Sequence, residues 1–313
     1  MRTLRLSTCF AIAVAAIRMT FAAEEKPAGL TYADVPYGPR ARNVLDFWQA
    51  DGDGPRPLIV FIHGGGWTQG GKSQFSHRYK PFLDSGISCA AINYRYSTET
   101  PLPAPVLDAA RAIQFLRFKA KEWNIDRDRV ALTGGSAGGC TSMWILLHDD
   151  LADPNSEDPV ERESTRVSAA AVGNAQASLD PKVIEEWLGP NVLRHRMIWT
   201  AVGERNLTDA LANYEKNKST YVEFSPYNHL TKDDPPLMMT YTEHHPMTLP
   251  SKNANHGIHH SVFGLKAKEK ANRLGCEFHL IIAGEDELSS DEYADSTGFL
   301  IDKLLPRTVD DSQ

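Results

Sequence analysis

Short apolar runs alternate with longer segments of helical periodicity through most of the 313-residue chain. This alternation is typical of βαβ units that stack into a mostly parallel sheet. The run PLIVFI is apolar along its whole length, as expected for a strand that is buried on both faces. The pattern predicts an α/β fold with strands at 31–35, 43–49, 57–62, 88–95, 129–134, 167–173, 236–242 and 277–284.

Helical spacing is clearest between 103 and 123, where apolar residues return every three or four positions. The charged segment 149–166, rich in Pro, Asn and Ser, predicts a solvated loop. Residues 180–230 hold irregular helical segments with several aromatic residues, which indicates a small insertion over the sheet. Further helices are expected at about 137–148, 262–274 and 291–305.

The first residues include Arg2 and Arg5. A mostly apolar run follows them, and small residues lie near Ala22. This three-part pattern predicts a secretory signal peptide over residues 1–22, followed by one domain over 23–313. Arg18 interrupts the apolar run, which makes it too short and too broken to span a membrane. We therefore expect a secreted or periplasmic protein, with a mitochondrial-type N-terminus as the alternative.

Loss of residues 1–22 removes three arginines and no acidic residue, so the formal net charge moves from −7 to about −10. An acidic chain is poorly suited to bind nucleic acid or an anionic membrane surface. Three cysteines remain, Cys89, Cys140 and Cys276. Their odd number and wide spacing predict buried thiols rather than a disulfide framework.

The stretch TGGSAGG at 133–139 follows a predicted strand and precedes a predicted helix. It contains the pattern G-x-S-x-G, which marks a sharp strand-to-helix turn that exposes a nucleophilic serine. Ser136 would project above the carboxyl edge of the sheet, near the positive end of the following helix. We therefore predict Ser136 as a nucleophile, with a glycine-rich turn and a capping serine as the alternative.

A glycine run in the sequence HGGGW directly follows the strand at 57–62. Backbone N–H groups of Gly64, Gly65 and Gly66 would point at an oxyanion, and Ala137 after the nucleophile would supply another. His63 is interpreted as orienting this loop rather than as a base. Trp67 and the aromatic residues of the insertion suggest a partly apolar pocket, with core packing as the alternative.

These motifs resemble the α/β-hydrolase superfamily, in particular its esterase and lipase branch with an HGGGW loop, which includes hormone-sensitive-lipase-like and feruloyl or acetyl esterase-like enzymes. The stretches INYRYS and FSPYNHLTKDDPP add to the resemblance, which runs from about Asp34 to Asp302. It implies an α/β-hydrolase fold with an eight-stranded, mostly parallel sheet and helices on both faces. It also implies an acyl-transfer site with no cofactor and no metal.

The histidine that this family usually has after its last strand is missing here. The corresponding turn reads Ala-Gly-Glu-Asp at 283–286, and the preceding His279 lies inside a predicted strand, where it is interpreted as packed. Glu243 stands where the family's acid usually lies, although aspartate is more common there. Among the histidines at 244–260, which alone could restore the order serine, acid and base, we predict His259 as the base.

Several alternatives to this triad stay open. The histidines could be ordinary polar loop residues, or the triad could be incomplete. Acid and base could be exchanged across the site, with Glu285 or Asp286 opposite the histidines. A zinc site is a further alternative, with the ligand set Glu243, His244, His245, His256, His259 and His260.

Two functional hypotheses from different classes follow. The first is a secreted serine hydrolase that cleaves a small-molecule or carbohydrate-linked carboxylic ester through an acyl-Ser136 intermediate. The second is a catalytically weakened ligand-binding protein that keeps the hydrolase fold. A serine peptidase is a third, weaker hypothesis, and the sequence does not indicate an oligomeric state.

Overall fold

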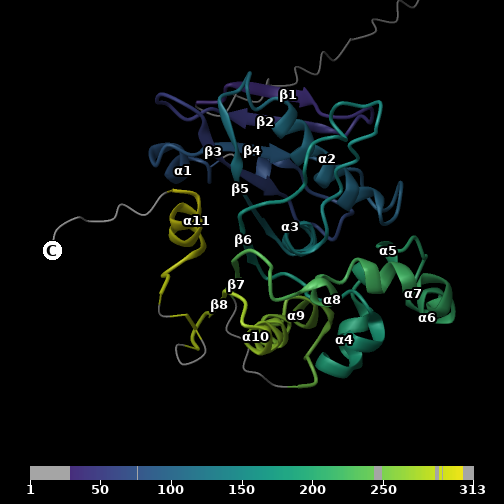
Figure 1. The fold of residues 1–313 in the computed structure, drawn as a ribbon. Coiled ribbons are helices and arrows are strands. Elements are labelled where there is room, and N and C mark those ends of the chain that lie inside the picture. Colours follow the sequence, from purple (N-terminus) through teal and green to yellow (C-terminus); the bar gives the residue numbers. More distant parts are fainter. Residues whose placement is uncertain (1–28, 76, 243–248, 286–288, 291, 306–313) are drawn as a thin grey trace, which may run out of the picture.

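One sheet of eight strands organises the described part of the chain (Figure 1). The structure is a computed structural model and describes residues 29–305 except 76, 243–248, 286–288 and 291. The strands are β1 (Tyr32–Pro36), β2 (Val44–Trp48), β3 (Arg56–Ile62), β4 (Ser88–Ile92), β5 (Ile125–Gly135), β6 (Ala169–Gly173), β7 (Leu237–Tyr241) and β8 (Phe278–Ile282). Their spatial order is β1-β2-β4-β3-β5-β6-β7-β8. Only β1–β2 and β2–β4 pair antiparallel within this sheet, so the predicted mostly parallel, eight-stranded sheet is confirmed.

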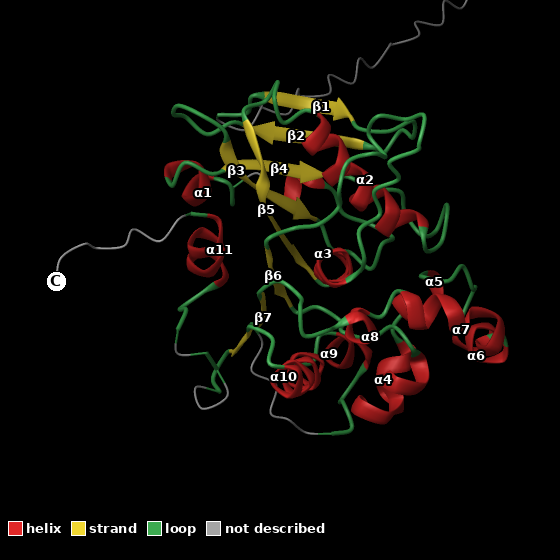
Figure 2. Cartoon of the chain, viewed as in Figure 1, coloured by secondary structure: helices red, strands yellow, loops and turns green. Residues whose placement is uncertain are grey.

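Helices cover both faces of the sheet (Figure 2). One face carries α1 (Lys80–Asp84) and α11 (Ser296–Leu304), and the other carries α2 (Ala104–Phe118), α3 (Ala137–Leu147) and α10 (Val262–Leu274). Alternate residues of β3 enter the two layers, with Val60 packed on one side and Phe61 on the other. The strand is apolar throughout because both of its faces are buried. No helix within the described residues is long and apolar enough to cross a membrane.

The connection between β6 and β7 forms the predicted insertion, green in Figure 1. Its helices are α4 (Pro181–Leu188), η2 (Pro190–Arg194), α5 (Met197–Thr200), α6 (Leu207–Ala212), α7 (Tyr214–Glu223) and α8 (Pro226–His229). Three short elements were not predicted from the sequence: η1 (Lys72–Phe75), α1 and α9 (Ala254–Ile258). The start of α9 does carry a capping signal, because the Asn253 side chain accepts a hydrogen bond from the His256 N–H at 3.0 Å.

Two predicted helix boundaries are displaced by local turns. The helix predicted over 103–123 ends at Phe118, because the chain turns before β5 and the Ile125 N–H donates to the Ala120 carbonyl at 2.8 Å. The helix predicted from 291 begins at Ser296. Asp295 caps it by accepting a hydrogen bond from the Gly298 N–H at 2.8 Å, which fixes the first turn.

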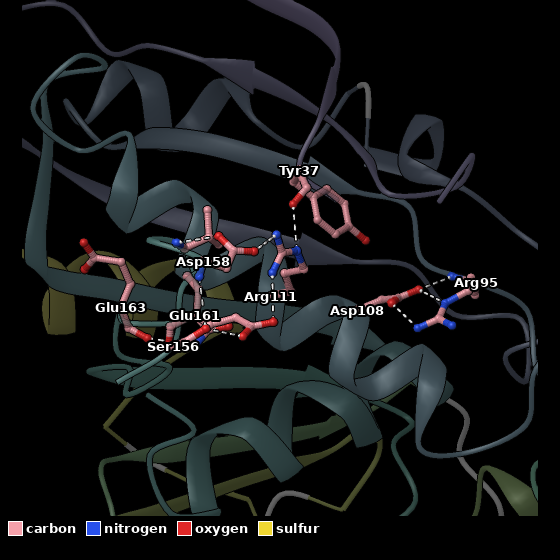
Figure 3. A network of polar contacts seen from close by, with 10 residues as sticks. Tyr37, Arg95, Asp108, Arg111, Ser156, Asp158, Glu161 and Glu163 are labelled. Atoms are coloured by element: carbon pink, nitrogen blue, oxygen red, sulfur yellow. Dashed lines mark hydrogen bonds and ion pairs between the residues drawn. The ribbon is translucent and has the colours of Figure 1, made fainter. Parts of the chain in front are cut away.

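Charged side chains tie α2 to neighbouring segments (Figure 3). The Arg95 guanidinium donates to both carboxylate oxygens of the buried Asp108, at 2.8 and 2.6 Å. Farther along α2, Arg111 donates to Asp158 at 2.6 Å. The segment 149–166 is thus a loop, as predicted, but it is anchored on α2 and not solvated along its whole length.

The three described cysteines are free thiols. Cys89 and Cys140 are buried, as predicted. The prediction of burial is wrong for Cys276, which is half-buried between α10 and β8 with Sγ 2.8 Å from the Thr231 carbonyl oxygen.

Candidate active site

Ser136 occupies the sharp turn between β5 and α3. Its backbone has φ 52° and ψ −124°, a conformation that residues with a side chain rarely adopt. The turn is held because the Ser136 N–H donates to the Gly173 carbonyl at 2.9 Å and the Ser136 carbonyl accepts from the Cys140 N–H at 2.8 Å. The strand, turn and helix that the G-x-S-x-G pattern requires are therefore present.

Gly138 allows the first turn of α3 to pass close to the end of β3. A Cβ atom at this position would lie 2.1 Å from the carbonyl oxygen of Ile62 and 2.5 Å from that of His63. Only glycine fits such a close approach to backbone atoms. The same packing brings the loop that follows β3 beside Ser136.

His259 is the predicted base that the structure brings to Ser136. Its Nε2 lies 3.0 Å from Ser136 Oγ. His259 ends α9, and its Nδ1 lies 3.2 Å from the carbonyl oxygen of Asn255. Because a carbonyl oxygen can only accept a hydrogen bond, this contact favours the tautomer with the proton on Nδ1, which leaves Nε2 able to accept a proton from the serine.

His256 and His260 are buried side chains rather than polar loop residues. Their rings meet edge to face at 4.9 Å. The Nδ1 of His256 accepts a hydrogen bond from the Lys252 N–H, and the Nδ1 of His260 accepts one from the Val262 N–H, both at 3.1 Å. These contacts shape the segment around α9 and so help to place His259.

The predicted acid, Glu243, lies outside the described residues, as do His244, His245 and Asp286. The exchange of acid and base across the site is therefore not tested. Half of the set named for a zinc site also falls outside the described residues. Among the residues that the structure does describe, no three His, Cys, Asp or Glu side chains are grouped in a way that could hold a metal ion.

His279 packs at the edge of the sheet, as its place in a predicted strand indicated. It is 8% exposed, with Nδ1 3.0 Å from Ser290 Oγ and Nε2 3.1 Å from Glu277 Oε1. Its ring meets Tyr293 edge to face. These partners hold the imidazole within the fold, and the interpretation of His279 as a packed residue is confirmed.

The HGGGW loop lies beside Ser136. A Cβ atom on Gly64 would lie 3.5 Å from Ser136 Cβ, and Gly65 and Gly66 line a cavity together with the serine. Ala137 is the first residue of α3, where the helix leaves N–H groups without an internal partner. In the described part of the chain, no carbonyl accepts a hydrogen bond from the N–H groups of Gly65, Gly66 or Ala137. These groups can therefore bind an oxyanion.

His63 lies buried beneath this loop. Its ring stacks on Tyr94 at 4.0 Å, and its Nδ1 lies 2.8 Å from the Gly64 carbonyl oxygen. Burial lowers the pKa of His63 to about 4; the hydrogen bond to Gly64 opposes this shift and the charge of Arg42 adds to it. His63 is thus neutral at physiological pH and supports the loop, in agreement with its interpretation as an orienting residue.

Two cavities meet at Ser136 and His259. The first, of about 850 Å³, extends over the sheet edge between α1 and α11, and its apolar walls include Phe61, Phe75 and Phe82. The second, of about 630 Å³, lies on the side of the insertion. Apart from Ser136 and His259, its described lining consists of Gly65, Gly66, Thr68, Gln69, His195, Arg196, Asn253, Asn255 and His256. One cavity is therefore partly aromatic and the other polar.

The prediction that Trp67 and the aromatic residues of the insertion form a pocket is wrong. None of them is among the described residues that line the two cavities. Trp67 is fully buried, and its Nε1–H donates to Thr141 Oγ1 at 3.0 Å. In the insertion, Tyr214 and Tyr221 are buried and Trp187 packs against the core. These side chains pack in or against the hydrophobic core, because burial stabilises them more than exposure at an open cavity.

His195 and Arg196 line the second cavity but were not identified from the sequence. They belong to the insertion, between η2 and α5. The Arg196 guanidinium donates to Thr68 Oγ1 at 2.6 Å, which links the insertion to the HGGGW loop. No spacing or motif marks these residues, since only the tertiary path of the insertion brings them near Ser136.

Comparison with known proteins agrees with this architecture. The probable carboxylic ester hydrolase LipM of Mycobacterium tuberculosis is 31% identical over 213 residues, which are 66% of this chain and 46% of that protein. An acetyl ester-xyloside bifunctional hydrolase from Caldicellulosiruptor lactoaceticus matches with a TM-score of 0.61 and 23% identity, over 83% of this chain and 87% of that one. A truncated carbohydrate esterase from gut microbiota matches with a TM-score of 0.67 and 19% identity, over 90% of this chain and 98% of that one. The two structural similarities show a shared fold, and the chain spans about half the length of the curated relatives it matches.

The sequence also matches a known family directly. Residues 45–255 match the BD-FAE family. The matched range covers most of the chain and contains the HGGGW loop and the turn at Ser136. The chain therefore belongs to the BD-FAE family, within the esterase and lipase branch of the α/β-hydrolase superfamily.

Proposed function

We propose that this chain is a serine hydrolase that cleaves carboxylic esters. The observation that carries the proposal is the 3.0 Å contact between Ser136 Oγ and His259 Nε2, beside a cavity that Gly65 and Gly66 also line. An imidazole at this distance can take the hydroxyl proton as the serine attacks. Its relatives named as esterases and carboxylic ester hydrolases support the same activity.

The reaction proceeds in two halves. Ser136 Oγ attacks the ester carbonyl carbon while His259 Nε2 takes its proton, and the N–H groups of Gly65, Gly66 and Ala137 stabilise the negative oxygen. The tetrahedral intermediate expels the alcohol, which receives the proton from His259, and an acyl-Ser136 ester remains. A water molecule then attacks this ester, with His259 as base again, and releases the carboxylic acid and free Ser136.

His259 must keep its orientation while it becomes an imidazolium. Its Nδ1 lies 3.2 Å from the Asn255 carbonyl, so the Nδ1–H has an acceptor in both protonation states. We assign the acidic partner of the imidazolium to Glu243, on the position of that residue after β7 in the sequence. A carboxylate there would stabilise the charged ring, as in other serine hydrolases.

The two cavities indicate the kind of ester. The carbonyl carbon of an ester carries an acyl group and an alcohol group, and when this carbon lies at Ser136 each cavity can hold one of them. The partly aromatic first cavity suits an apolar acyl group. The polar second cavity suits a hydroxylated alcohol. Solved structures of similar fold include an acetyl ester-xyloside hydrolase and a carbohydrate esterase, which fits a carbohydrate-linked ester as substrate.

We further propose that the chain is exported and that residues 1–22 are removed as a signal peptide. The support is the sequence pattern of early arginines, an apolar run and small residues near Ala22. N-terminal sequencing of protein recovered from the periplasm of a bacterial host tests this. A mature N-terminus near residue 23 is expected, and an intact residue 1 in exported protein contradicts it.

Labelling with a fluorophosphonate probe tests the proposed activity, with hydrolysis of p-nitrophenyl acetate measured in parallel. The wild-type protein should be labelled and active, whereas Ser136→Ala and His259→Ala should lose both signals. His148→Ala is the matched control, because this histidine stacks on Trp144 away from both cavities. If the wild-type protein is neither labelled nor active, the proposed hydrolase activity is wrong, and a binding protein of the same fold becomes the better interpretation.

A further inference from the structure

The second cavity contains a histidine that the proposed reaction does not use. His195 lies between η2 and α5, and it lines this cavity together with Ser136 and His259. Its ring meets that of His259 edge to face, with the centroids 6.2 Å apart. An imidazole this close to the reacting groups is within reach of a substrate that occupies the cavity.

A backbone contact fixes which nitrogen of His195 carries the proton. The Met197 N–H donates to His195 Nδ1 at 3.3 Å. Because a backbone N–H can only donate, Nδ1 is the unprotonated nitrogen of the neutral ring. The proton is therefore on Nε2, and the neutral imidazole offers a hydrogen-bond donor from its other side.

His195 remains neutral over the working range of an esterase. Burial is the main cause that lowers the pKa of His195 to about 4, and the neighbouring His259 and Arg196 contribute to the same shift. The ring at neutral pH is thus a donor through Nε2–H only.

The rest of the lining gives this donor a polar setting. Every other described side chain on the wall of the second cavity is polar, and the guanidinium of Arg196 is held by the neutral hydroxyl of Thr68 at 2.6 Å. An alkyl group placed here would find no apolar wall among the described residues and would displace water from polar groups. A hydroxylated group would instead replace that water with direct hydrogen bonds.

We propose that His195 is a specificity-determining residue that donates a hydrogen bond from Nε2 to a hydroxyl oxygen on the alcohol part of the ester. This inference rests on the proposed esterase function and names one contact that selects the substrate. His195 does not transfer a proton in the reaction. It favours alcohols that carry an additional hydroxyl group over alkyl alcohols of equal length.

Kinetics with a matched pair of substrates test the proposal. Glyceryl monoacetate and propyl acetate share the acyl group and the three-carbon alcohol, and they differ only in two hydroxyl groups. In His195→Leu, the ratio of kcat/KM for glyceryl monoacetate to that for propyl acetate should fall about five- to tenfold, mainly through KM, as expected for one hydrogen bond. His195→Gln, whose side-chain amide can donate from a similar position, should restore part of the ratio.

Arg194→Ala is the control, because this exposed neighbour is not among the described residues of the cavity wall. A ratio in His195→Leu within twofold of the wild-type value overturns the proposal.

A binding measurement separates this proposal from the esterase function. Ser136→Ala cannot form an acyl-enzyme, so its affinity for intact glyceryl monoacetate can be measured by titration. The double variant Ser136→Ala/His195→Leu should bind glyceryl monoacetate about fivefold more weakly than Ser136→Ala. This expectation does not depend on the turnover of the wild-type protein. Equal affinities, or no measurable binding to either variant, would overturn the role of His195. Normal binding together with a wild-type protein that hydrolyses neither ester would instead contradict the proposed esterase activity.

Discussion

Gly65 lies so close to the carbonyl group of Gln69 that no side chain fits at position 65. A Cβ atom on Gly65 would lie 2.3 Å from the Gln69 carbonyl oxygen, and the backbone of Gly65 has φ +102°. A side chain at position 65 would therefore push the loop apart beside the cavity that Gly65 lines together with Ser136. The geometry of the oxyanion site depends on this contact.

Substitution of Gly65 should accordingly impair catalysis. We expect Gly65→Ala to lower kcat by about 10²-fold, because a displaced N–H group no longer fits the oxyanion. Gly66→Ala should lower kcat less, since the nearest atom to its Cβ is Met197 Cβ at 3.9 Å and only the positive φ opposes the change. Steady-state hydrolysis of p-nitrophenyl acetate measures both. An equal or larger loss in Gly66→Ala would mean that the Gly65–Gln69 contact is not what holds the site.

Removal of His259 should affect the chemical step and not substrate binding. We expect His259→Ala to lower kcat by about 10³- to 10⁴-fold with little change in KM, because the imidazole acts on the serine proton. The double variant Ser136→Ala/His259→Ala should be no less active than Ser136→Ala alone, since the two residues act as one unit. Steady-state kinetics on the same acetate ester decide this. A further loss in the double variant would show that His259 acts independently of Ser136.

Burial of His63 should make the protein less stable at acidic pH. The pKa of His63 is about 4 in the folded protein and 6.5 as its ordinary value. As pH falls below 6.5, the unfolded chain takes up a proton that the folded protein does not accept until pH 4, so stability is lost across this window. By pH 4.5 the loss from this one group is on the order of 2 kcal/mol.

Urea unfolding at pH 7 and pH 4.5 checks this expectation. In His63→Asn, the free energy of unfolding should fall between the two pH values by about 2 kcal/mol less than in the wild-type protein. The variant is itself expected to be less stable at pH 7, because it loses the stacking on Tyr94. The comparison therefore uses the difference between the two pH values within each protein. Equal differences in both proteins would show that His63 titrates normally in the folded state.

Loss of the carboxylate at Asp108 should destabilise the fold. Asp108 is 4% exposed, and its carboxylate accepts two hydrogen bonds from the Arg95 guanidinium and one from the Arg95 N–H. We expect Asp108→Ala to lower the free energy of unfolding by about 3 kcal/mol, because a partly buried guanidinium loses its counter-ion. Glu161→Ala removes an exposed ion pair to Arg111 at 3.5 Å and an exposed hydrogen bond from Ser156 Oγ at 2.7 Å, and it should cost less than about 1 kcal/mol. Urea unfolding compares the two, and similar losses would contradict this difference in burial.

The parts of the fold that could be predicted from the sequence are those with strong local patterns. β3 is buried on both faces, and its apolar run is visible without any tertiary information. The turn at Ser136 could be predicted because only glycine fits at position 138, where the end of β3 passes close to α3. This requirement is visible in the sequence as part of the G-x-S-x-G pattern. Short elements such as α1 and α9 have only five residues each, too few for helical periodicity to show.

Side-chain environments in the HGGGW loop and in the insertion could not be predicted in the same way. Trp67 and His195 illustrate the difficulty, since the first packs into the core and the second faces a cavity. Whether an aromatic ring lines a cavity depends on how distant segments pack, and sequence spacing does not contain that information. The base could be limited to the histidines at 244–260 because no histidine follows the last strand, but spacing alone does not distinguish His259 from the others.

The position of His259 before α10 bears on how the proposed active site can change between relatives. Both reacting side chains precede β8, and α11 contributes wall residues of the first cavity such as Thr297 and Leu300. In a hydrolase whose base follows the last strand, changes in that final loop endanger proton transfer. Here neither Ser136 nor His259 belongs to the connection between β8 and α11. Thr297 and Leu300 are accordingly suitable positions for changing the preference for the acyl group.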